Sequence, residues 1–289
     1  MIWWVAILLG IIQGIFMFFP VSSTSHLALM QHWLIGMGIS LPDPDSAEMI
    51  LFDLVVHVGT LVSIAVVFRE SLSIYLRQAI QGFLNLVDSS KKQTNIGGLY
   101  VKLTLLGIVS VAVTGLIGFP MKAAFESIFA QPIIISLTLT TTGILLWWTD
   151  ILSDRKIGLR QMGLWIAIIV GVAQGLALMP GLSRSGTTIA FALFVGLQRK
   201  EAAEFSFFIA IPTILGACLL QGIEVYMAGG LLSIPVTSLL IGFSVAALIG
   251  IAALYLVLNL LYDAKFRFFS YYVWILAAII AFTSVGQIL

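Results

Sequence analysis

The sequence has little charge and almost no cysteine. Only 9% of its 289 residues are charged, and Cys218 is the single cysteine. One cysteine excludes an internal disulfide and a metal site built from several thiolates. A net charge of +1 without a basic run excludes the positive surface that nucleic-acid binding needs. The composition is instead 60% hydrophobic with a mean hydropathy of +1.11, which indicates an integral membrane protein whose partners are lipids or lipid-soluble molecules.

Apolar runs define the predicted membrane spans. A helix needs about 20 residues to cross the hydrocarbon core. Suitable runs lie near 50–68, 99–118, 131–149, 205–221, 235–261 and 269–288. Two further apolar regions, 1–36 and 162–197, are interrupted midway by Pro, Ser and Thr. Because backbone freed by such a break cannot face lipid, we expect both regions to be re-entrant helical hairpins. The predicted fold is an all-α polytopic membrane protein with six full transmembrane helices and two re-entrant hairpins.

The two interrupted regions resemble each other, and so do the spans that follow them. The matching marks are Gln13-Gly14 with Gln174-Gly175, Pro20 with Pro180, Phe52 with Phe205, and Thr60 with Thr213. Residues 1–150 and 151–289 would each hold one hairpin and three spans. An odd number of spans turns the second copy upside down relative to the first. We therefore predict one membrane domain made of an inverted-topology repeat, with both hairpin tips near the midplane.

Basic residues fix the orientation of this arrangement, because Lys and Arg accumulate on the cytoplasmic side. All but Lys122 of the basic loop residues fall on one side of the inverted arrangement. These residues are Arg69, Arg77, Lys91, Lys92, Lys102, Arg155, Lys156, Arg160, Arg199, Lys200, Lys265 and Arg267. We predict that this side is cytoplasmic and that both termini lie on the outer face.

Arg184 is the only basic residue within an apolar segment. Placing Arg at a helix centre in a membrane costs about 3 kcal/mol, so Arg184 should face an anion, a polar cavity or a carboxylate. Gly181 and Gly186 would let backbone N–H groups close around a phosphate that Arg184 grips. A helix restarting near Thr187 would add free N–H donors. These features favour an anion site over an internal ion pair.

The first interruption is rich in hydroxyl groups. Ser22, Ser23, Thr24 and Ser25 precede His26. Hydroxyls can bond phosphate oxygens, and an imidazole titrates near neutral pH. One hydroxyl should simply cap the returning helix, because Ser and Thr are favoured at helix N-termini. We predict that the remaining groups belong to the same anion site as Arg184.

Three stretches carry a specific resemblance. They are Pro-Val-Ser-Ser-Thr-Ser-His at 20–26, Phe-Asp-Leu-Val-Val-His-Val-Gly-Thr at 52–60 and Pro-Gly-Leu-Ser-Arg-Ser-Gly at 180–186. With them the chain resembles the integral-membrane undecaprenyl diphosphate phosphatases of the bacitracin-resistance type, which recycle the cell-wall lipid carrier. The resemblance implies hydrolysis of undecaprenyl diphosphate to undecaprenyl phosphate and inorganic phosphate. It also implies a multi-pass protein of the bacterial plasma membrane whose two tips form one pocket open to the outer face.

The resemblance assigns roles to these residues. His26 would be the general base or acid, and Arg184 would bind the diphosphate. Ser22 and Ser23 would orient phosphate oxygens, or one hydroxyl would be the nucleophile. The expected substrate-binding residues are Thr24, Ser25, Gly181, Ser183, Ser185, Gly186, Thr187, Gln13 and Gln174. A divalent cation, Mg²⁺ or Ca²⁺, is expected as cofactor, with unknown ligands.

One position departs from the family pattern. The family carries Glu or Gln and then, four residues later, Glu before the Pro-Val-Ser-Ser run, whereas this chain has Gln13 and Met17. A thioether can neither hold a hard cation nor move a proton. Asp53 and His57, one helical turn apart, either compensate or form an ordinary interfacial polar pair. The alternative function is that of a weak or inactive homologue that binds and translocates polyprenyl phosphate. The oligomeric state stays open between monomer and homodimer.

Overall fold

A computed structural model gives the fold and describes residues 2–87, 95–129, 131–152, 155–227 and 234–286. The described part of the chain is helical, with no β-strand beyond an isolated bridge between Ile157 and Leu197. The helices are α1 (Trp3–Phe16), α2 (Ser23–Gly36), α3 (Ala47–Val67), α4 (Arg69–Val87), α5 (Asn95–Phe129), α6 (Pro132–Ile151), η1 (Leu159–Gln161), α7 (Leu164–Leu176), α8 (Arg184–Phe194), α9 (Arg199–Met227), α10 (Val236–Tyr262) and α11 (Arg267–Gly286).

Five described helices are long and apolar enough to cross a membrane, namely α3, α5, α6, α9 and α10. The sixth predicted span, 269–288, corresponds to α11. Its apolar stretch Arg267–Thr283 is shorter than the others, and residues 287–288 lie outside the described residues. The prediction of an all-α polytopic membrane protein is confirmed.

Both interrupted regions form pairs of short helices. In the first, α1 ends at Phe16 and α2 begins at Ser23; in the second, α7 ends at Leu176 and α8 begins at Arg184. The helix α8 starts before the predicted Thr187, because the Ser183 hydroxyl caps it by accepting the Gly186 N–H at 3.1 Å. The helix breaks are thus where the sequence predicts them, whereas re-entrance and the inverted repeat stay predictions.

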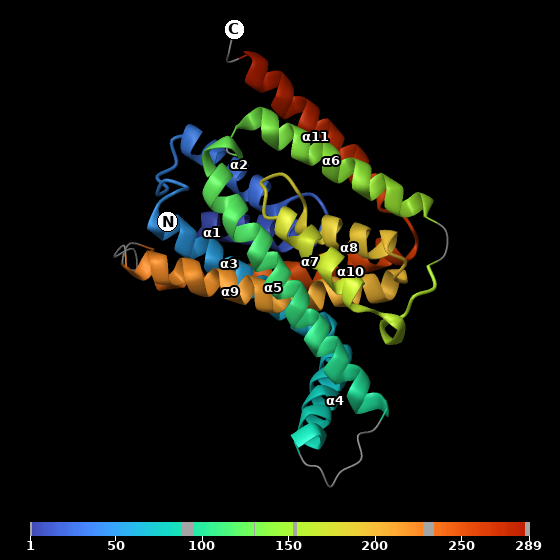
Figure 1. Cartoon of the computed structure of the whole chain (residues 1–289). Helices are drawn as coiled ribbons and strands as arrows, with labels where there is room; N and C mark the ends of the chain where they lie inside the picture. Colours follow the sequence, from blue (N-terminus) through green and yellow to red (C-terminus); the bar gives the residue numbers. More distant parts are fainter. Residues whose placement is uncertain (1, 88–94, 130, 153–154, 228–233, 287–289) are drawn as a thin grey trace.

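Helix α4 is an element that the sequence reading did not assign. It follows α3 after a single residue and packs against the start of α5, and the two project together from the helical body (Figure 1). Tyr75 on α4 donates a hydrogen bond to the Thr104 hydroxyl on α5 at 2.9 Å. Apolar side chains such as Leu76 and Leu84 remain exposed. Lys91 and Lys92 lie beyond α4, outside the described residues.

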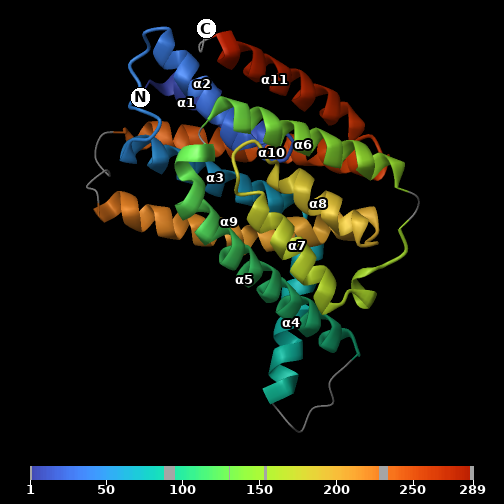
Figure 2. The ribbon, with the colours of Figure 1, turned by 45° about the horizontal axis from the view of Figure 1, so that its top comes forward.

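Several helices lie side by side in pairs, and serine hydroxyls form hydrogen bonds across these pairs. The helices α6 and α11 run along each other (Figures 1 and 2), and Ser136 donates to the Ala277 carbonyl at 2.8 Å. Ser63 on α3 likewise bonds a carbonyl on α10, and Ser110 on α5 bonds Ala167 on α7 at 2.7 Å. Hydroxyl-to-backbone bonds of this kind are a common device for joining helices in membranes.

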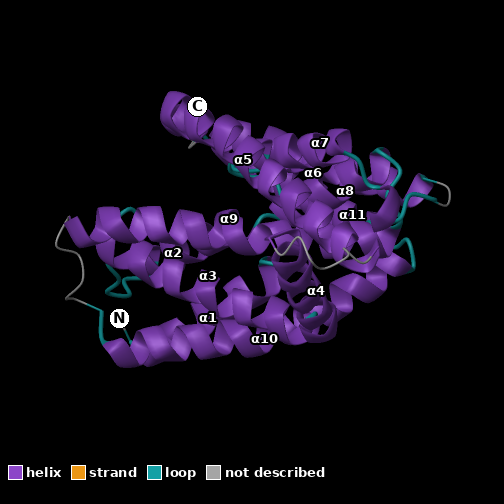
Figure 3. Ribbon diagram, turned by 60° about the horizontal axis from the view of Figure 1, so that its bottom comes forward, coloured by secondary structure: helices purple, strands orange, loops and turns teal. Residues whose placement is uncertain are grey.

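Glycines let each hairpin pack closely on a helix of the other half of the chain. The helix α1 packs along α10, and α7 packs along α5 (Figure 3). A Cβ atom on Gly14 would lie 2.9 Å from the Ala246 carbonyl oxygen, and one on Gly171 would lie 2.6 Å from that of Ser110. Any larger residue would push these helices apart. The two halves therefore interlock, and this brings the hairpin tips together.

Candidate functional site: the meeting point of two hairpin tips

The first tip turns through Ser22, which has φ +69°. This region of backbone conformation favours glycine, so a serine there marks local strain of the kind found at functional sites. The turn aims the Ser22 carbonyl at the ring of His26, whose Nδ1 lies 2.7 Å from that oxygen. A carbonyl only accepts, so Nδ1 carries a proton and the other ring nitrogen, Nε2, is the one that exchanges protons.

Aromatic residues hold the His26 ring. Phe16 stacks on it with ring centroids 4.0 Å apart, and the Tyr272 hydroxyl lies 2.7 Å from Nε2. Tyr272 comes from α11, so the end of the chain reaches the first tip. Phe19, on the same tip, packs edge-on against Phe269 of α11 at 5.1 Å. Two aromatic residues of α11 thus contact the first hairpin tip.

Threonines of α6 fix the second tip. Thr138 donates to the Pro180 carbonyl at 2.7 Å, and Thr142 donates to the Gly181 carbonyl while accepting the Ser183 N–H, both at 3.2 Å. Gly181 has φ +86°, and a Cβ there would collide with the Thr138 hydroxyl. Glycine at 181 therefore serves the turn and its anchorage on α6.

The two tips touch each other through three contacts. Ser185 donates to the Phe18 carbonyl at 3.3 Å. Gly186 faces Pro20 so closely that a Cβ would lie 3.0 Å from the proline Cβ. The Arg184 guanidinium meets Met17 Sδ, with Nη2 at 3.8 Å. The structure thus brings residues near 20 and near 185 into one site, as the sequence predicts.

Arg184 has no carboxylate partner among the described residues. The ion pairs found there join Lys265 to Asp263 and Arg267 to Asp150. Arg184 is only partly accessible, and its interaction with Met17 is a weak one with a thioether. Its charge also acts electrostatically on His57 of α3. A shielded guanidinium without an acid is suited to a phosphate ligand.

The tip hydroxyls form two small clusters. In the first, Ser22 lies 3.1 Å from Ser25 and 3.5 Å from Thr24, oxygen to oxygen. Ser23 is partly exposed at the N-terminus of α2. In the second, the Ser183 and Ser185 oxygens are 3.4 Å apart. Ser183 also accepts the Gly186 N–H and Ser185 also donates to the Phe18 carbonyl, whereas the hydroxyls of the first cluster contact one another and can turn toward an incoming anion.

Three further candidate residues near the tips have buried polar atoms without a hydrogen-bond partner among the described residues. The hydroxyl of Thr187 in α8 is buried and has no described partner. Gln13 donates to Met17 Sδ at 3.6 Å, while its Oε1 is buried without a donor from the described residues. Gln174 bridges two helices by donating to Thr114 and Thr213, and its Oε1 is likewise unpartnered. Gln174 therefore joins α7 to α5 and α9.

Asp53 and His57 do not pair through their side chains. The Asp53 carboxylate accepts a hydrogen bond from Gln31 of α2 at 3.0 Å. The His57 Nδ1 lies 2.7 Å from the backbone carbonyl of Asp53. Residues four apart lie on one face of a helix, which is why the sequence suggests a side-chain pair. In α3 the same spacing instead brings the His57 ring to the backbone carbonyl of Asp53. Asp53 thus links the first hairpin to α3.

The donor atoms at the tips do not form a resident cation site. Among the described residues, no group of three His, Cys, Asp or Glu side chains is placed to hold a metal. Mg²⁺ and Ca²⁺ prefer carboxylate oxygens, and position 17 offers a thioether.

Sequence reasoning missed Tyr272, Thr138 and Thr142. Thr142 belongs to a visible run, Thr140-Thr141-Thr142, and Thr138 lies two residues before it inside the same mainly apolar span, so this stretch was a usable signal. Tyr272 carries no comparable local mark. Its contact with His26 joins residues 246 positions apart.

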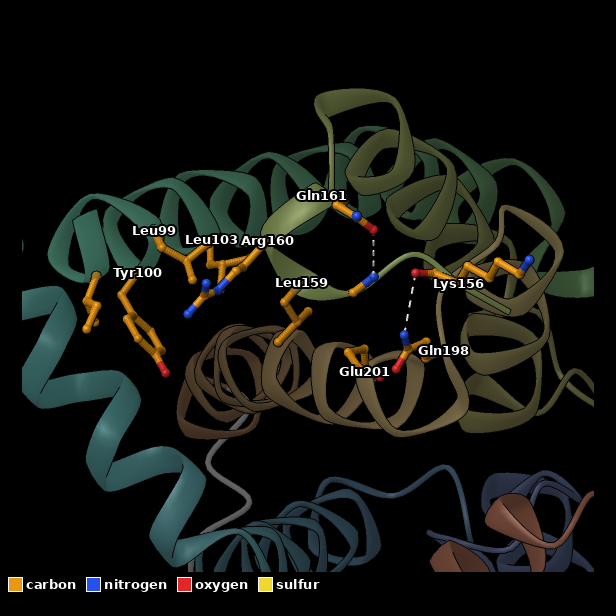
Figure 4. A pocket seen from close by; sticks show the side chains of 11 residues that line it. Leu99, Tyr100, Leu103, Lys156, Leu159, Arg160, Gln161, Gln198 and Glu201 are labelled. Carbon is orange, nitrogen blue, oxygen red and sulfur yellow. Dashed lines mark hydrogen bonds between the residues drawn. The ribbon is translucent and has the colours of Figure 1, made fainter. Parts of the chain in front are cut away.

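A crevice of about 600 Å³ lies elsewhere on the molecule, between η1, the start of α5 and the start of α9 (Figure 4). Its walls include Tyr100, Leu103, Arg160 and Glu201. None of its lining residues belongs to either hairpin tip. The crevice is thus separate from the candidate site.

The fold and site define a multi-pass helical membrane protein that brings two broken hairpins to one polar, cationic centre. Comparison with known sequences identifies the group more closely. Residues 6–279 match the family described as Bacitracin resistance protein BacA, and the chain belongs to that family.

Similar curated proteins carry one common name. An undecaprenyl-diphosphatase of Halorhodospira halophila is 56% identical over 277 residues, covering 96% of both chains. One of Alkalilimnicola ehrlichii is also 56% identical, over 280 residues and 96% of this chain and 95% of its own. An undecaprenyl-diphosphatase of Alkaliphilus metalliredigens is 38% identical over 276 residues, 95% of this chain and 96% of its own.

Proposed function

We propose that the protein hydrolyses undecaprenyl diphosphate to undecaprenyl phosphate and inorganic phosphate. One observation carries the proposal: Arg184 is shielded at the contact of two hydroxyl-rich tips and has no acid beside it among the described residues. The names of the similar proteins supply the substrate. This activity would recycle the cell-wall lipid carrier and give resistance to bacitracin.

Each tip contributes a different part of the chemistry. Arg184 would grip the diphosphate and stabilise the charge that develops at the phosphorus. Hydroxyls of Ser22, Ser183 and Thr187 would orient phosphate oxygens. His26 Nε2 would take a proton from the nucleophile and return it to the leaving phosphate. A cation bound to the diphosphate would neutralise part of its charge.

Water is the nucleophile that the geometry favours. A serine nucleophile needs a hydrogen bond to its base. The hydroxyls of Ser22 and Ser25 contact each other, while His26 Nε2 contacts Tyr272. A water molecule activated by His26 would attack the terminal phosphorus as the bond to the bridging oxygen breaks. The hydroxyl joins the released inorganic phosphate, and the bridging oxygen stays on the lipid phosphate.

The proposal includes an orientation. Lys and Arg in the loops favour the cytoplasmic side for the ends of α8 and α10, so both termini and the pocket mouth would face outward. The long α4 and the start of α5 would then project into the cytoplasm. The site would act on lipid carrier in the outer leaflet of the bacterial plasma membrane.

Arg184→Ala tests the proposal in purified protein. Charged hydrogen bonds are worth about 1.5–3 kcal/mol, so we expect binding of farnesyl diphosphate (C15) and phosphate release to fall roughly 10- to 100-fold. Arg184→Lys should recover only part of this loss, because an ammonium lacks the planar fork. Arg160→Ala, which changes an arginine of the separate crevice, is the matched control.

Three results would decide the matter. Unchanged binding in Arg184→Ala would contradict the site. An equal loss in Arg160→Ala would point to a general effect of surface charge. Native protein that binds the C15 and C55 diphosphates but releases no phosphate, with Mg²⁺, Ca²⁺ or chelator, would favour translocation without chemistry.

A further inference from the structure

His26 is held by groups from two ends of the chain. Ser22 O lies 2.7 Å from Nδ1, and Tyr272 Oη lies 2.7 Å from Nε2. Phe16 stacks on the ring at an interplanar angle of 19°. Both ring nitrogens and one face of the imidazole are therefore in contact with other groups. Only the Tyr272 contact involves the nitrogen that exchanges protons.

The hydrogen positions follow from the partners. Because the Ser22 carbonyl accepts, Nδ1 must carry a hydrogen, and in the neutral ring Nε2 accepts the Tyr272 O–H. When Nε2 gains a proton, it becomes a donor and the phenolic oxygen accepts from it. A phenol can do both, whereas a carboxylate would always accept and a phenylalanine would do neither. Tyr272 is thus suited to a histidine that changes protonation during a reaction.

The contact makes little contribution to packing. Tyr272 is 42% exposed, and its ring centroid lies 5.7 Å from that of His26 and 6.4 Å from that of Phe16. The hydroxyl, 2.7 Å from Nε2, makes the closest of these contacts. Its neighbour Tyr271 has a similar exposure of 48% but contacts Trp147 and Trp274 instead.

We propose that Tyr272 acts on the reaction through His26: its hydroxyl holds the ring in the Nδ1–H tautomer and passes the proton, donating to Nε2 as it accepts a proton from the attacking water. This inference rests on the proposed function insofar as His26 is the proton carrier. It assigns the end of the chain, through α11, a direct part in preparing the first tip.

Tyr272→Phe removes the hydroxyl and keeps the ring. Loss of one net hydrogen bond corresponds to about a fivefold effect, so kcat for phosphate release should fall about fivefold while KM stays the same. Tyr271→Phe should keep native kcat. If Tyr272→Phe has native kcat, the inference is wrong.

A double-mutant cycle separates an action through His26 from general damage. If Tyr272 acts only through His26, then His26→Ala and the double variant His26→Ala/Tyr272→Phe should have equal residual rates. A purely structural tyrosine would lower the rate in both backgrounds by the same factor. Additive losses would therefore overturn the inference.

Chemical labelling of His26 tests the contact without relying on activity. Diethyl pyrocarbonate reacts with an unprotonated ring nitrogen, and Tyr272 covers that nitrogen. Tyr272→Phe should increase the rate of His26 labelling about fivefold, because it removes one net hydrogen bond from Nε2. Peptide mass spectrometry measures this rate. Labelling of His32 and His57 should not change. Unchanged labelling of His26 would refute the contact, even if the native protein released no phosphate and the proposed function had failed.

The native protein offers a measurement that needs no variant. Nitrogen-15 NMR of labelled histidine distinguishes the two neutral tautomers, and we expect His26 to be the Nδ1–H form. A neutral His26 with its proton on Nε2 could not accept from Tyr272 and would overturn the inference. This result would stand if Tyr272→Phe failed to fold.

Discussion

Met17→Glu restores the acid that the family pattern carries beside the first tip. Met17 Sδ lies 3.8 Å from Arg184 Nη2, so a carboxylate at the same place would form an ion pair with the guanidinium. Two unit charges about 4 Å apart attract each other by about 4 kcal/mol at the effective dielectric of partly buried sites. Desolvation of the new charge costs several kcal/mol in turn. We therefore expect the free energy of unfolding to change by less than about 2 kcal/mol.

The same substitution should be harmful once Arg184 is gone. A buried charge left without its partner costs about 3–5 kcal/mol. Met17→Glu in the Arg184→Ala background should therefore lower the melting temperature in detergent far more than it does in native protein. Equal losses in both backgrounds would refute the geometry, since Arg184 would then not be the partner of position 17.

Met17→Glu should lower phosphate release in the presence of chelator and raise it in the presence of added Mg²⁺ or Ca²⁺. A glutamate at 17 would repel the diphosphate and compete for Arg184, so release in chelator should fall below the native rate. With added Mg²⁺ or Ca²⁺, the new carboxylate gains a partner, and release should exceed the native rate. Met17→Gln, of similar length and neutral, is the matched control and should show neither effect. A native-like response of Met17→Glu in both conditions would contradict this reasoning.

Two further predictions concern the first tip and the orientation. Ser22→Gly should have a higher melting temperature than Ser22→Ala, because only glycine adopts φ +69° without strain, and its free energy of unfolding should be larger by about 1 kcal/mol. Equal melting temperatures would contradict the strain at Ser22. Both variants should lose phosphate release to the same extent if the hydroxyl orients phosphate. Cysteine at Asp43 should react with an impermeant maleimide on intact cells, whereas cysteine at Lys156 should react only after permeabilisation, with Cys218 changed to Ser in both. External labelling at Lys156 would overturn the proposed orientation.

The sequence predicts the helix breaks because their causes are local. Pro20 and Pro180 each stand beside hydroxyl residues in long apolar stretches, and a proline removes a helical hydrogen bond wherever the chain goes next. The cost of placing Arg184 in a membrane is also a property of the residue itself. These observations suffice to place both tips in one site.

Other features depend on contacts that no local pattern encodes. Tyr272 is one of several aromatic residues on α11, and only the packing of that helix selects it as the partner of His26. The spacing of Asp53 and His57 correctly indicates a shared helical face. It does not indicate that His57 bonds the backbone of Asp53 while the carboxylate bonds Gln31. Helix α4 was missed because it is amphipathic, and a search for continuous apolar runs does not detect such a helix.

The contact between His26 and Tyr272 has a consequence for biosynthesis. His26 is translated early, but its partner belongs to the last described helix, 246 positions later. Arg184 emerges between them. A ribosome therefore completes most of the membrane insertion before all parts of the site exist, and α11 supplies the final one. Any chain that stops after α10 would hold both hairpins and the arginine, yet its histidine would lack the hydroxyl that aligns it.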